Sequence, residues 1–286
     1  MQQKIKTTRG SFAYRSYGSR DNPPLFLVHG WPQNSYCWHA VAQYLTAYYI
    51  IAPDLRGLGD SERTLEVNAY SKDQLGLDIF ALATALKIER FYLAGHDWGS
   101  AVAQEMALRS PERIHKLVLI NMMILNNGVG KKKAAEALSK DMFRSSWYQF
   151  FQNIPEFPEQ LLAGKEDVWV RFFCQGIRHP IPEEAMAEYI RCYQIPHTIT
   201  TGANLYRSMS IDRKRWSKYT KRKIAVPSHI IHGRLDRVVI PAFLEDVEKA
   251  FEHPIKISYL EGGHFICDEF PKEVATAINT FLSEKE

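Results

Sequence analysis

Short, continuous apolar runs alternate over much of this chain with segments whose apolar positions recur at helical spacing. A run without alternating polar residues is typical of a strand buried on both faces of a parallel sheet. The predicted strands are Lys4 to Thr8, Phe12 to Tyr17, Leu25 to Val28, Tyr49 to Ala52, Phe91 to Ala94, Leu117 to Asn121, Ser228 to His232 and Ile255 to Leu260. The helices predicted between and after them are Tyr36 to Leu45, Ser71 to Leu86, Gly99 to Leu108, Pro241 to Phe251 and Pro271 to Leu282. This alternation predicts an α/β protein with a mostly parallel sheet flanked by helices, preceded by a short antiparallel hairpin.

The alternation stops between residues 122 and 216. No strand is predicted there, and prolines separate the helical segments Ala134 to Met142, Ser146 to Phe151, Glu159 to Leu162, Val168 to Gln175, Glu183 to Tyr193 and Ile199 to Ser208. We therefore predict an α/β core domain formed by residues 1–121 and 217–286. An all-helical cap, inserted at 122–216, is expected to stand over the core as a lid.

The sequence GHDWG follows the strand that begins at Phe91 and leads into a helix. Its residues Gly95, Asp97 and Gly99 have the spacing of the nucleophile elbow G-x-S-x-G, with aspartate in place of serine. A carboxylate is ionised at neutral pH, so it can attack a saturated carbon without first losing a proton. The product of that attack is an aspartyl ester. The alternative is that Asp97 only caps the following helix.

Hydrolysis of such an ester requires a water molecule activated by a base. The carboxyl ends of parallel strands face one crevice, and the loops after the last two strands offer Asp236 and His264. The order Asp97, Asp236, His264 is the nucleophile, acid, base order of the nucleophile-elbow hydrolases. Taken singly, Asp236 could be a turn former and His264 a surface loop residue.

These motifs carry a family resemblance. With HGWP at His29 to Pro32, GHDWG, Asp236 and GGHF at Gly262 to Phe265, the chain resembles α/β-hydrolase-fold proteins of the epoxide hydrolase and haloalkane dehalogenase group. Within that group it is most similar to the epoxide hydrolases. The resemblance implies that the backbone N–H groups of Trp31 and Trp98 form an oxyanion hole, and the Trp31–Pro32 bond is a candidate for a cis peptide.

The leaving group distinguishes the two chemistries. An opened epoxide is an alkoxide that must be protonated, whereas a halide leaves without a proton. Tyr148 in RSSWYQFFQNIPEFPE and Tyr206 in NLYRSM resemble the acid tyrosines of epoxide hydrolases, and phenols remain protonated at neutral pH. We therefore predict hydrolysis of an epoxide to a vicinal diol, catalysed by Asp97, His264 with Asp236, and the two tyrosines. The alternative for the tyrosines is packing within the cap.

A dehalogenase with the same triad is the second hypothesis. Against it, Trp31 stands where many haloalkane dehalogenases carry a halide-binding Asn, and Asn121 stands where one subgroup carries a catalytic Glu. Trp98 and Ala101 stand where fluoroacetate dehalogenases, which are similar in sequence, carry two arginines. In favour of a dehalogenase, Trp147 could complete a halide-binding site built from N–H donors. The third hypothesis is a non-catalytic binding or sensing module of the same fold.

Composition adds limits on substrate and partners. The cap aromatics Trp147, Phe150, Trp169 and Phe172 predict a pocket for a small apolar substrate. The four cysteines have no spacing that would suggest a zinc site, so no metal is expected. The predicted epoxide hydrolase is also expected to work without a cofactor. The formal charge of +4 is modest, and the basic runs at Lys131 to Lys133 and Arg213 to Lys223 are interpreted as solvated faces rather than a nucleic-acid site. Without an apolar signal or membrane span, we expect a cytoplasmic protein, monomeric or homodimeric.

Overall fold

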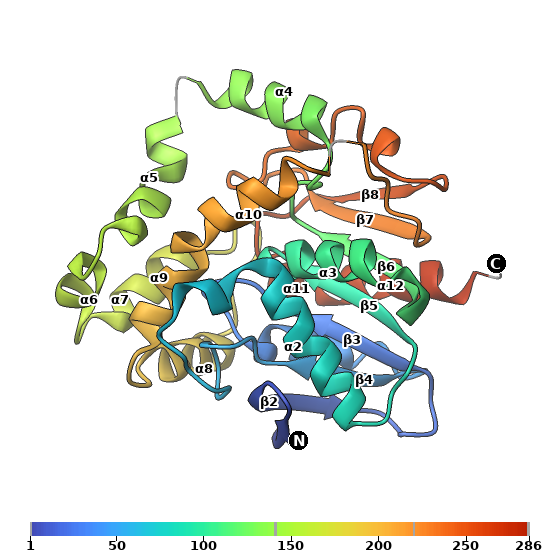
Figure 1. Cartoon of the computed structure of the whole chain (residues 1–286), viewed down its shortest axis with the longest axis horizontal. Coiled ribbons are helices and arrows are strands. Elements are labelled where there is room, and N and C mark those ends of the chain that lie inside the picture. Colours follow the sequence, from blue (N-terminus) through green and yellow to red (C-terminus); the bar gives the residue numbers. More distant parts are fainter. Residues whose placement is uncertain (1, 140–141, 220, 285–286) are drawn as a thin grey trace.

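The computed structural model describes residues 2–139, 142–219 and 221–284. One eight-stranded sheet runs through it in the order β1-β2-β4-β3-β5-β6-β7-β8 (Figure 1). Its strands are β1 Gln2–Thr7, β2 Gly10–Tyr17, β3 Pro24–Val28, β4 Tyr49–Pro53, β5 Phe91–His96, β6 Ile114–Ile120, β7 Ser228–Gly233 and β8 Lys256–Leu260. β2 pairs antiparallel with β1 and with β4, and the other neighbours are parallel. The predicted α/β class and mostly parallel sheet are confirmed.

The central strands bring the candidate site together. β3 and β5 are buried along almost their whole length, and the rings of Phe26 and Phe91 pack between them with centroids 4.6 Å apart. Val28 pairs with Gly95, and His96 pairs with Ile120. Because these strands are parallel, the loops that follow β3, β5, β6, β7 and β8 all leave from one edge of the sheet.

Helices cover both faces of the sheet (Figure 1). They are α1 His39–Ala42, α2 Lys72–Ala85, α3 Trp98–Arg109, α11 Ile266–Glu269 and α12 Pro271–Ser283. α2 packs on α3 on one face, and α1 packs on α11 and α12 on the other. None of the described helices is both long and apolar enough to cross a bilayer.

A helical segment separates β6 from β7. Its described helices are α4 Gly128–Leu138, α5 Met142–Asn153, α6 Phe157–Leu162, α7 Glu166–Phe173, α8 Glu183–Tyr193, α9 Thr198–Arg207 and α10 Met209–Trp216. α8 has the predicted bounds. The helix predicted at Ala134 to Met142 instead begins at Gly128 and ends at Leu138, and the last part of that prediction lies outside the described residues. α10 was not predicted, because its basic sequence lacks an apolar periodicity.

Another prediction fails between β7 and β8. The single helix expected at Pro241 to Phe251 is two short 3-10 helices, η4 Pro241–Leu244 and η5 Val247–Ala250. Between them Asp246 has a positive φ of 55°. Aspartate tolerates the left-handed conformation better than most residues, and one such residue is enough to interrupt a helix.

Candidate active site

Asp97 lies in the sharp turn between β5 and α3, with a φ of +52°. The turn packs backbone against backbone at the two glycines of GHDWG. A Cβ on Gly95 would lie 2.4 Å from the carbonyl oxygen of Gly99, and one on Gly99 would lie 2.1 Å from that of Val28. Side chains are therefore excluded at both positions, which explains the spacing seen in the sequence.

The two carboxylate oxygens of Asp97 have different partners. Oδ1 accepts a hydrogen bond of 2.9 Å from the backbone N–H of Trp31, and Oδ2 lies 3.2 Å from His264 Nε2. Asp97 holds the N-cap position of α3, but these contacts direct its carboxylate to the loops that carry Trp31 and His264. Burial alone would raise the pKa of Asp97, but the hydrogen bond and charge of His264 bring it below its ordinary value, with a smaller contribution from the N–H of Trp98. Asp97 is therefore an ionised carboxylate at neutral pH.

His264 is held between two carboxylates. Its Nδ1 lies 2.8 Å from Asp236 Oδ2, while the other oxygen of Asp236 accepts the N–H groups of Val238 and Val239. Burial alone would lower the pKa of His264, but the charges of Asp236 and Asp97 raise it to about 10. The three predicted triad residues are thus brought together, and His264 carries its proton in the unreacted protein.

A strand-end residue fixes the loop of His264. Asn121, with a positive φ of 46°, donates from Nδ2 to the carbonyl oxygens of Gly263 and His264, both at 2.8 Å. Its Oδ1 accepts the N–H of Gly233, where β7 ends. Sequence analysis noted Asn121 only as a departure from a relative's pattern. Its role could have been predicted from its position at the end of β6, next to β7.

The loop after β3 presents Trp31 to Asp97. The Trp31–Pro32 peptide bond is cis, as predicted. His29 lies beneath this loop, with Nδ1 2.8 Å from the Gly30 carbonyl oxygen and Nε2 2.9 Å from the N–H of Leu55. Burial lowers the pKa of His29, so its ring is neutral and links the ends of β3 and β4.

Tyr148 on α5 and Tyr206 on α9 are buried and contact each other, with ring centroids 5.7 Å apart. Tyr148 stacks on Trp31, and Tyr206 packs edge-on against Trp31 and Trp98. Burial, and with it the charge of Asp97, raises the pKa of both phenols above their ordinary value. Both hydroxyls therefore keep their protons at neutral pH.

A cavity of about 360 Å³ contains Asp97, Trp98, Tyr148 and Tyr206 in its wall. This volume is in the usual range for sites that take small molecules. The rest of the wall is mostly apolar and includes Met122, Met123, Met209, Val238, Val239 and Phe243. The described residues thus bring an ionised carboxylate and two phenols to one apolar cavity.

The aromatic residues predicted for the pocket are not in this wall. Trp147, Phe150 and Phe172 are 39%, 64% and 54% exposed, and Trp169 is buried against Trp31 and Phe173. Their helices, α5 and α7, are short and carry aromatic residues on more than one face. Which face meets the cavity is decided by how each helix is rotated in the assembled segment, and Tyr148 takes that position on α5.

A buried ion pair missed by sequence analysis lies next to this cavity. Lys72 Nζ, at the start of α2, is 2.9 Å from Asp212 Oδ2 on α10, and both side chains are fully buried. The same ammonium donates to the carbonyl oxygen of Leu205 and lies 4.1 Å from the ring centroid of Trp98. Leu205 directly precedes Tyr206, so Lys72 ties the position of that tyrosine to the sheet's helices. No local signal could reveal a pair 140 residues apart in sequence.

Comparison with known proteins identifies the family. Residues 23–271 match the family model for the alpha/beta hydrolase fold. The chain belongs to the alpha/beta hydrolase fold family. This hydrolase is 32% identical over 291 residues to epoxide hydrolase 1 of Caenorhabditis elegans, over 98% of this chain and 70% of that protein. It is 26% identical over 272 residues to a fluoroacetate dehalogenase of Burkholderia sp., over 92% of this chain and 88% of that one.

The fold of the hydrolase is also that of a solved enzyme. The crystal structure of epoxide hydrolase A from Mycobacterium thermoresistibile superposes with a TM-score of 0.86 at 24% identity. The match covers 100% of this chain and 99% of that chain. The predicted family is confirmed. Because its relatives include epoxide hydrolases and a dehalogenase, epoxide hydrolysis and dehalogenation are both still candidate reactions.

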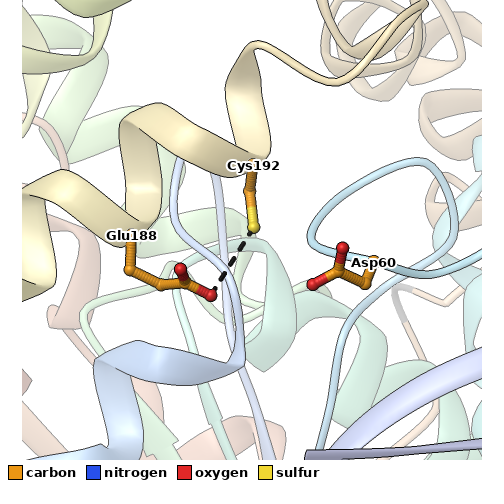
Figure 2. Close-up of side chains that lie close together, drawn as sticks. All are labelled: Asp60, Glu188 and Cys192. Atoms are coloured by element: carbon orange, nitrogen blue, oxygen red, sulfur yellow. Dashed lines mark hydrogen bonds between the residues drawn. The ribbon is translucent and has the colours of Figure 1, made fainter.

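A second polar cluster of the hydrolase lies away from Asp97. Potential ligand atoms of Asp60, Glu188 and Cys192 lie within 4.8 Å of one another, and Figure 2 shows Glu188 and Cys192 projecting from α8 toward Asp60. The guanidinium of Arg191 bonds to Asp60 at 2.6 Å and to Glu188 at 2.7 Å, and Arg15 bonds to Glu188 at 2.6 Å. Burial raises the pKa of Cys192, so its thiol stays protonated. Arginines already neutralise both carboxylates, and the cluster is an ion-pair network that joins α8 to the core.

The charge on His264 predicts a pH dependence of stability. Its folded pKa of about 10 lies above the ordinary value of 6.5, so its contribution is complete below pH 6.5 and is lost as the pH rises toward 10. We expect the free energy of unfolding to fall between pH 6.5 and 8 in the native protein, and to fall less in His264→Gln. Protonated His264, held by Asp236 and Asp97, contributes on the order of a few kcal/mol to the free energy of unfolding.

Denaturant unfolding across this window measures the effect. Buried cysteines would add a slope of their own near pH 8.5 and above, because their thiols ionise in the unfolded chain. The comparison is therefore made below that pH. Equal slopes in the two proteins would mean that His264 is not held as an imidazolium ion.

Proposed function

We propose that this hydrolase converts an epoxide to a vicinal diol through an ester on Asp97, with residues 122–216 acting as a lid over the core. The observation that supports this most strongly is the shared cavity. An ionised carboxylate and two protonated phenols, Tyr148 and Tyr206, line the same apolar space. A carboxylate supplies the nucleophile for the strained ring, and the phenols supply the proton that the ring oxygen requires.

In the first step, Asp97 Oδ2 attacks a ring carbon and the C–O bond to that carbon breaks. Oδ1, held by the N–H of Trp31, remains the carbonyl oxygen of the ester. The released alkoxide takes a proton from Tyr148 or Tyr206. Because burial raises the pKa of both phenols, both carry their protons at neutral pH and either can supply this one.

Ester formation changes the state of His264. The charge of Asp97 is one of the two that hold the proton on its ring, and the ester removes that charge. The pKa of His264 then falls, and its proton replaces the one lost by the tyrosine. His264 becomes a neutral base at the moment when the ester has to be hydrolysed.

In the second step, His264 Nε2 takes a proton from water, and the resulting hydroxide attacks Cγ of Asp97. The N–H groups of Trp31 and Trp98 stabilise the oxyanion that forms on Oδ1, a contribution of about 3 kcal/mol per donor. Collapse of this intermediate releases the diol, which carries away one proton. Asp97 is again ionised and His264 again protonated, so the proton count closes.

Dehalogenation remains the second candidate because of the similarity to a fluoroacetate dehalogenase and because Trp98 borders the cavity. A halide would need N–H donors there. The indole N–H of Trp98 has no hydrogen-bond partner in the described part of the chain, so it is one available donor. The other tryptophans offer less: the indole N–H of Trp216 is used by Glu105 at 2.7 Å, that of Trp31 by Tyr193 at 3.0 Å, and Trp147 is exposed outside the cavity wall. Phenols beside the carboxylate favour the epoxide.

A substrate panel tests the proposal directly. We expect diol from styrene oxide and related apolar epoxides, and little or no bromide from matched bromoalkanes, both measured with purified protein. Asp97→Asn should abolish product with either class. Bromide release without diol formation would establish a dehalogenase, and neither product, with the ligands still bound, would favour a non-catalytic binding module.

A further inference from the structure

The short helix that follows His264 carries two buried acids. This helix, α11, begins two residues after His264 and ends with Asp268 and Glu269. Asp268 accepts hydrogen bonds from the Tyr189 hydroxyl at 3.0 Å and from Gln33 Nε2 at 2.6 Å. Tyr189 lies on α8 and Gln33 lies in the loop after β3, so Asp268 fixes α11 between the helical segment and the core.

The carboxyl group of Glu269 joins two separate parts of the chain. Its Oε2 accepts hydrogen bonds of 2.8 Å from the backbone N–H groups of Ile177 and Arg178, in the loop between α7 and α8. Its Oε1 accepts a hydrogen bond of 2.9 Å from the N–H of Gly263, the residue before His264. One side chain therefore connects the segment between β6 and β7 to the loop that carries His264.

The same two parts of the chain pack directly on each other at Gly263. A Cβ on Gly263 would lie 2.8 Å from Cγ1 of Ile177 and 3.0 Å from Oε1 of Glu269. This approach is closer than ordinary van der Waals contact, so only glycine fits there without a shift of its neighbours. The packing of Ile177 and the hydrogen bonds of Glu269 thus act on one peptide group next to His264.

The position of this loop sets which atoms His264 can reach. Asn121 and His96 donate to the carbonyl oxygen of His264 at 2.8 and 2.7 Å, while Glu269 holds the N–H of the preceding residue. His264 Nε2 lies 3.2 Å from Asp97 Oδ2. A displacement of about 1 Å in a reacting group can cost on the order of 10²-fold in rate.

We propose that Glu269 is a positioning residue for His264, which it places for ester hydrolysis by holding Gly263 against the segment between β6 and β7. The proposal rests on the proposed function, in which His264 activates water in the second step. The first step depends on the carboxylate of Asp97 and on the two phenols. Loss of the Glu269 carboxyl group should therefore slow the second step and leave the first unchanged.

Glu269→Gln tests this with little change of shape. A glutamine side chain has one acceptor oxygen, so it cannot accept hydrogen bonds on both sides, and its NH₂ group would face other N–H groups. In single-turnover experiments with styrene oxide, we expect epoxide consumption within about twofold of the native rate and diol release slower by about tenfold or more. The ester should then accumulate, which intact-protein mass spectrometry measures.

Glu273→Gln is the matched control, because Glu273 is an exposed acid four residues further along the chain. Equal slowing of both steps in Glu269→Gln would overturn the proposal, since the side chain would then act only through the stability of the fold. Native rates for both steps would overturn it as well.

A second variant keeps the proposal testable if Glu269→Gln does not fold. Ile177→Ala removes the side-chain atoms that pack on Gly263 and keeps the backbone N–H that Glu269 accepts. We expect it to slow diol release, by a smaller factor than Glu269→Gln, at an unchanged rate of epoxide consumption. A native rate of diol release in Ile177→Ala, or slowing of both steps, would count against the proposal.

A measurement without substrate separates this proposal from the proposed function. The proton on His264 Nδ1 lies in a hydrogen bond of 2.8 Å to Asp236, so its NMR signal is expected far downfield, and His264→Gln identifies that signal by its loss. Glu269→Gln should shift or broaden the signal, and Glu273→Gln should not. If the native protein forms neither ester nor diol, the proposed function fails. A signal changed by Glu269→Gln alone would then still support the placement of His264, and an unchanged signal would overturn it.

Discussion

His264→Gln is expected to stop the reaction at the covalent ester, so that the protein gains the mass of one epoxide while diol formation falls by roughly 10²- to 10⁴-fold. Asp97 remains ionised and able to attack in this variant. Without a base 3.2 Å from Asp97 Oδ2, no water is activated to release the product. Intact-protein mass spectrometry after mixing with styrene oxide measures the adduct, and peptide mapping should place it on Asp97.

Two further variants make this result decisive. His264→Gln combined with Asp97→Asn should form no adduct, because the amide is a poor nucleophile. His253→Gln, a change at an exposed histidine, should turn over like the native protein. Diol formation by His264→Gln at a normal rate, or an adduct that persists without Asp97, would exclude the proposed covalent route.

Replacing both Tyr148 and Tyr206 with phenylalanine is expected to lower kcat for epoxide hydrolysis by about 10³-fold or more, with a smaller loss in each single variant. The two rings pack against Trp31 and Trp98, and phenylalanine keeps these contacts while removing the hydroxyls. The variant should therefore fold and still bind substrate. The lost step is protonation of the ring oxygen, which is measured as the rate of ester formation in single-turnover experiments.

The control removes a buried hydroxyl elsewhere. Tyr219→Phe loses a bond of 2.8 Å to Glu105 and leaves the cavity unchanged, so its kcat should stay within about threefold of the native value while its stability falls by about 1 kcal/mol. If the Tyr148 and Tyr206 double variant also stayed within about tenfold, the proton would come from another group. The argument for an epoxide over a halide would then lose its main support.

Much of the site was predictable because its signals are local. The backbone around Asp97 leaves no room for side chains at Gly95 and Gly99. The need for glycine at these two positions is visible within the five consecutive residues GHDWG. Asp236 and His264 were predictable in a different way. Each lies in the loop that follows a strand of a parallel sheet, so chain order alone places both at the edge where Asp97 lies.

The tertiary structure decided the contacts made between distant segments. Lys72 meets Asp212, and Lys131 and Arg213 share one cavity, because α4 and α10 fold back over the same edge of the sheet. It also decided that Tyr148 faces this cavity while its neighbour Trp147 is exposed. Composition and hydrophobic periodicity predict which residues a helix contains. The rotation of each short helix about its axis depends on the packing of the whole segment, and that rotation determines which side chains line the cavity.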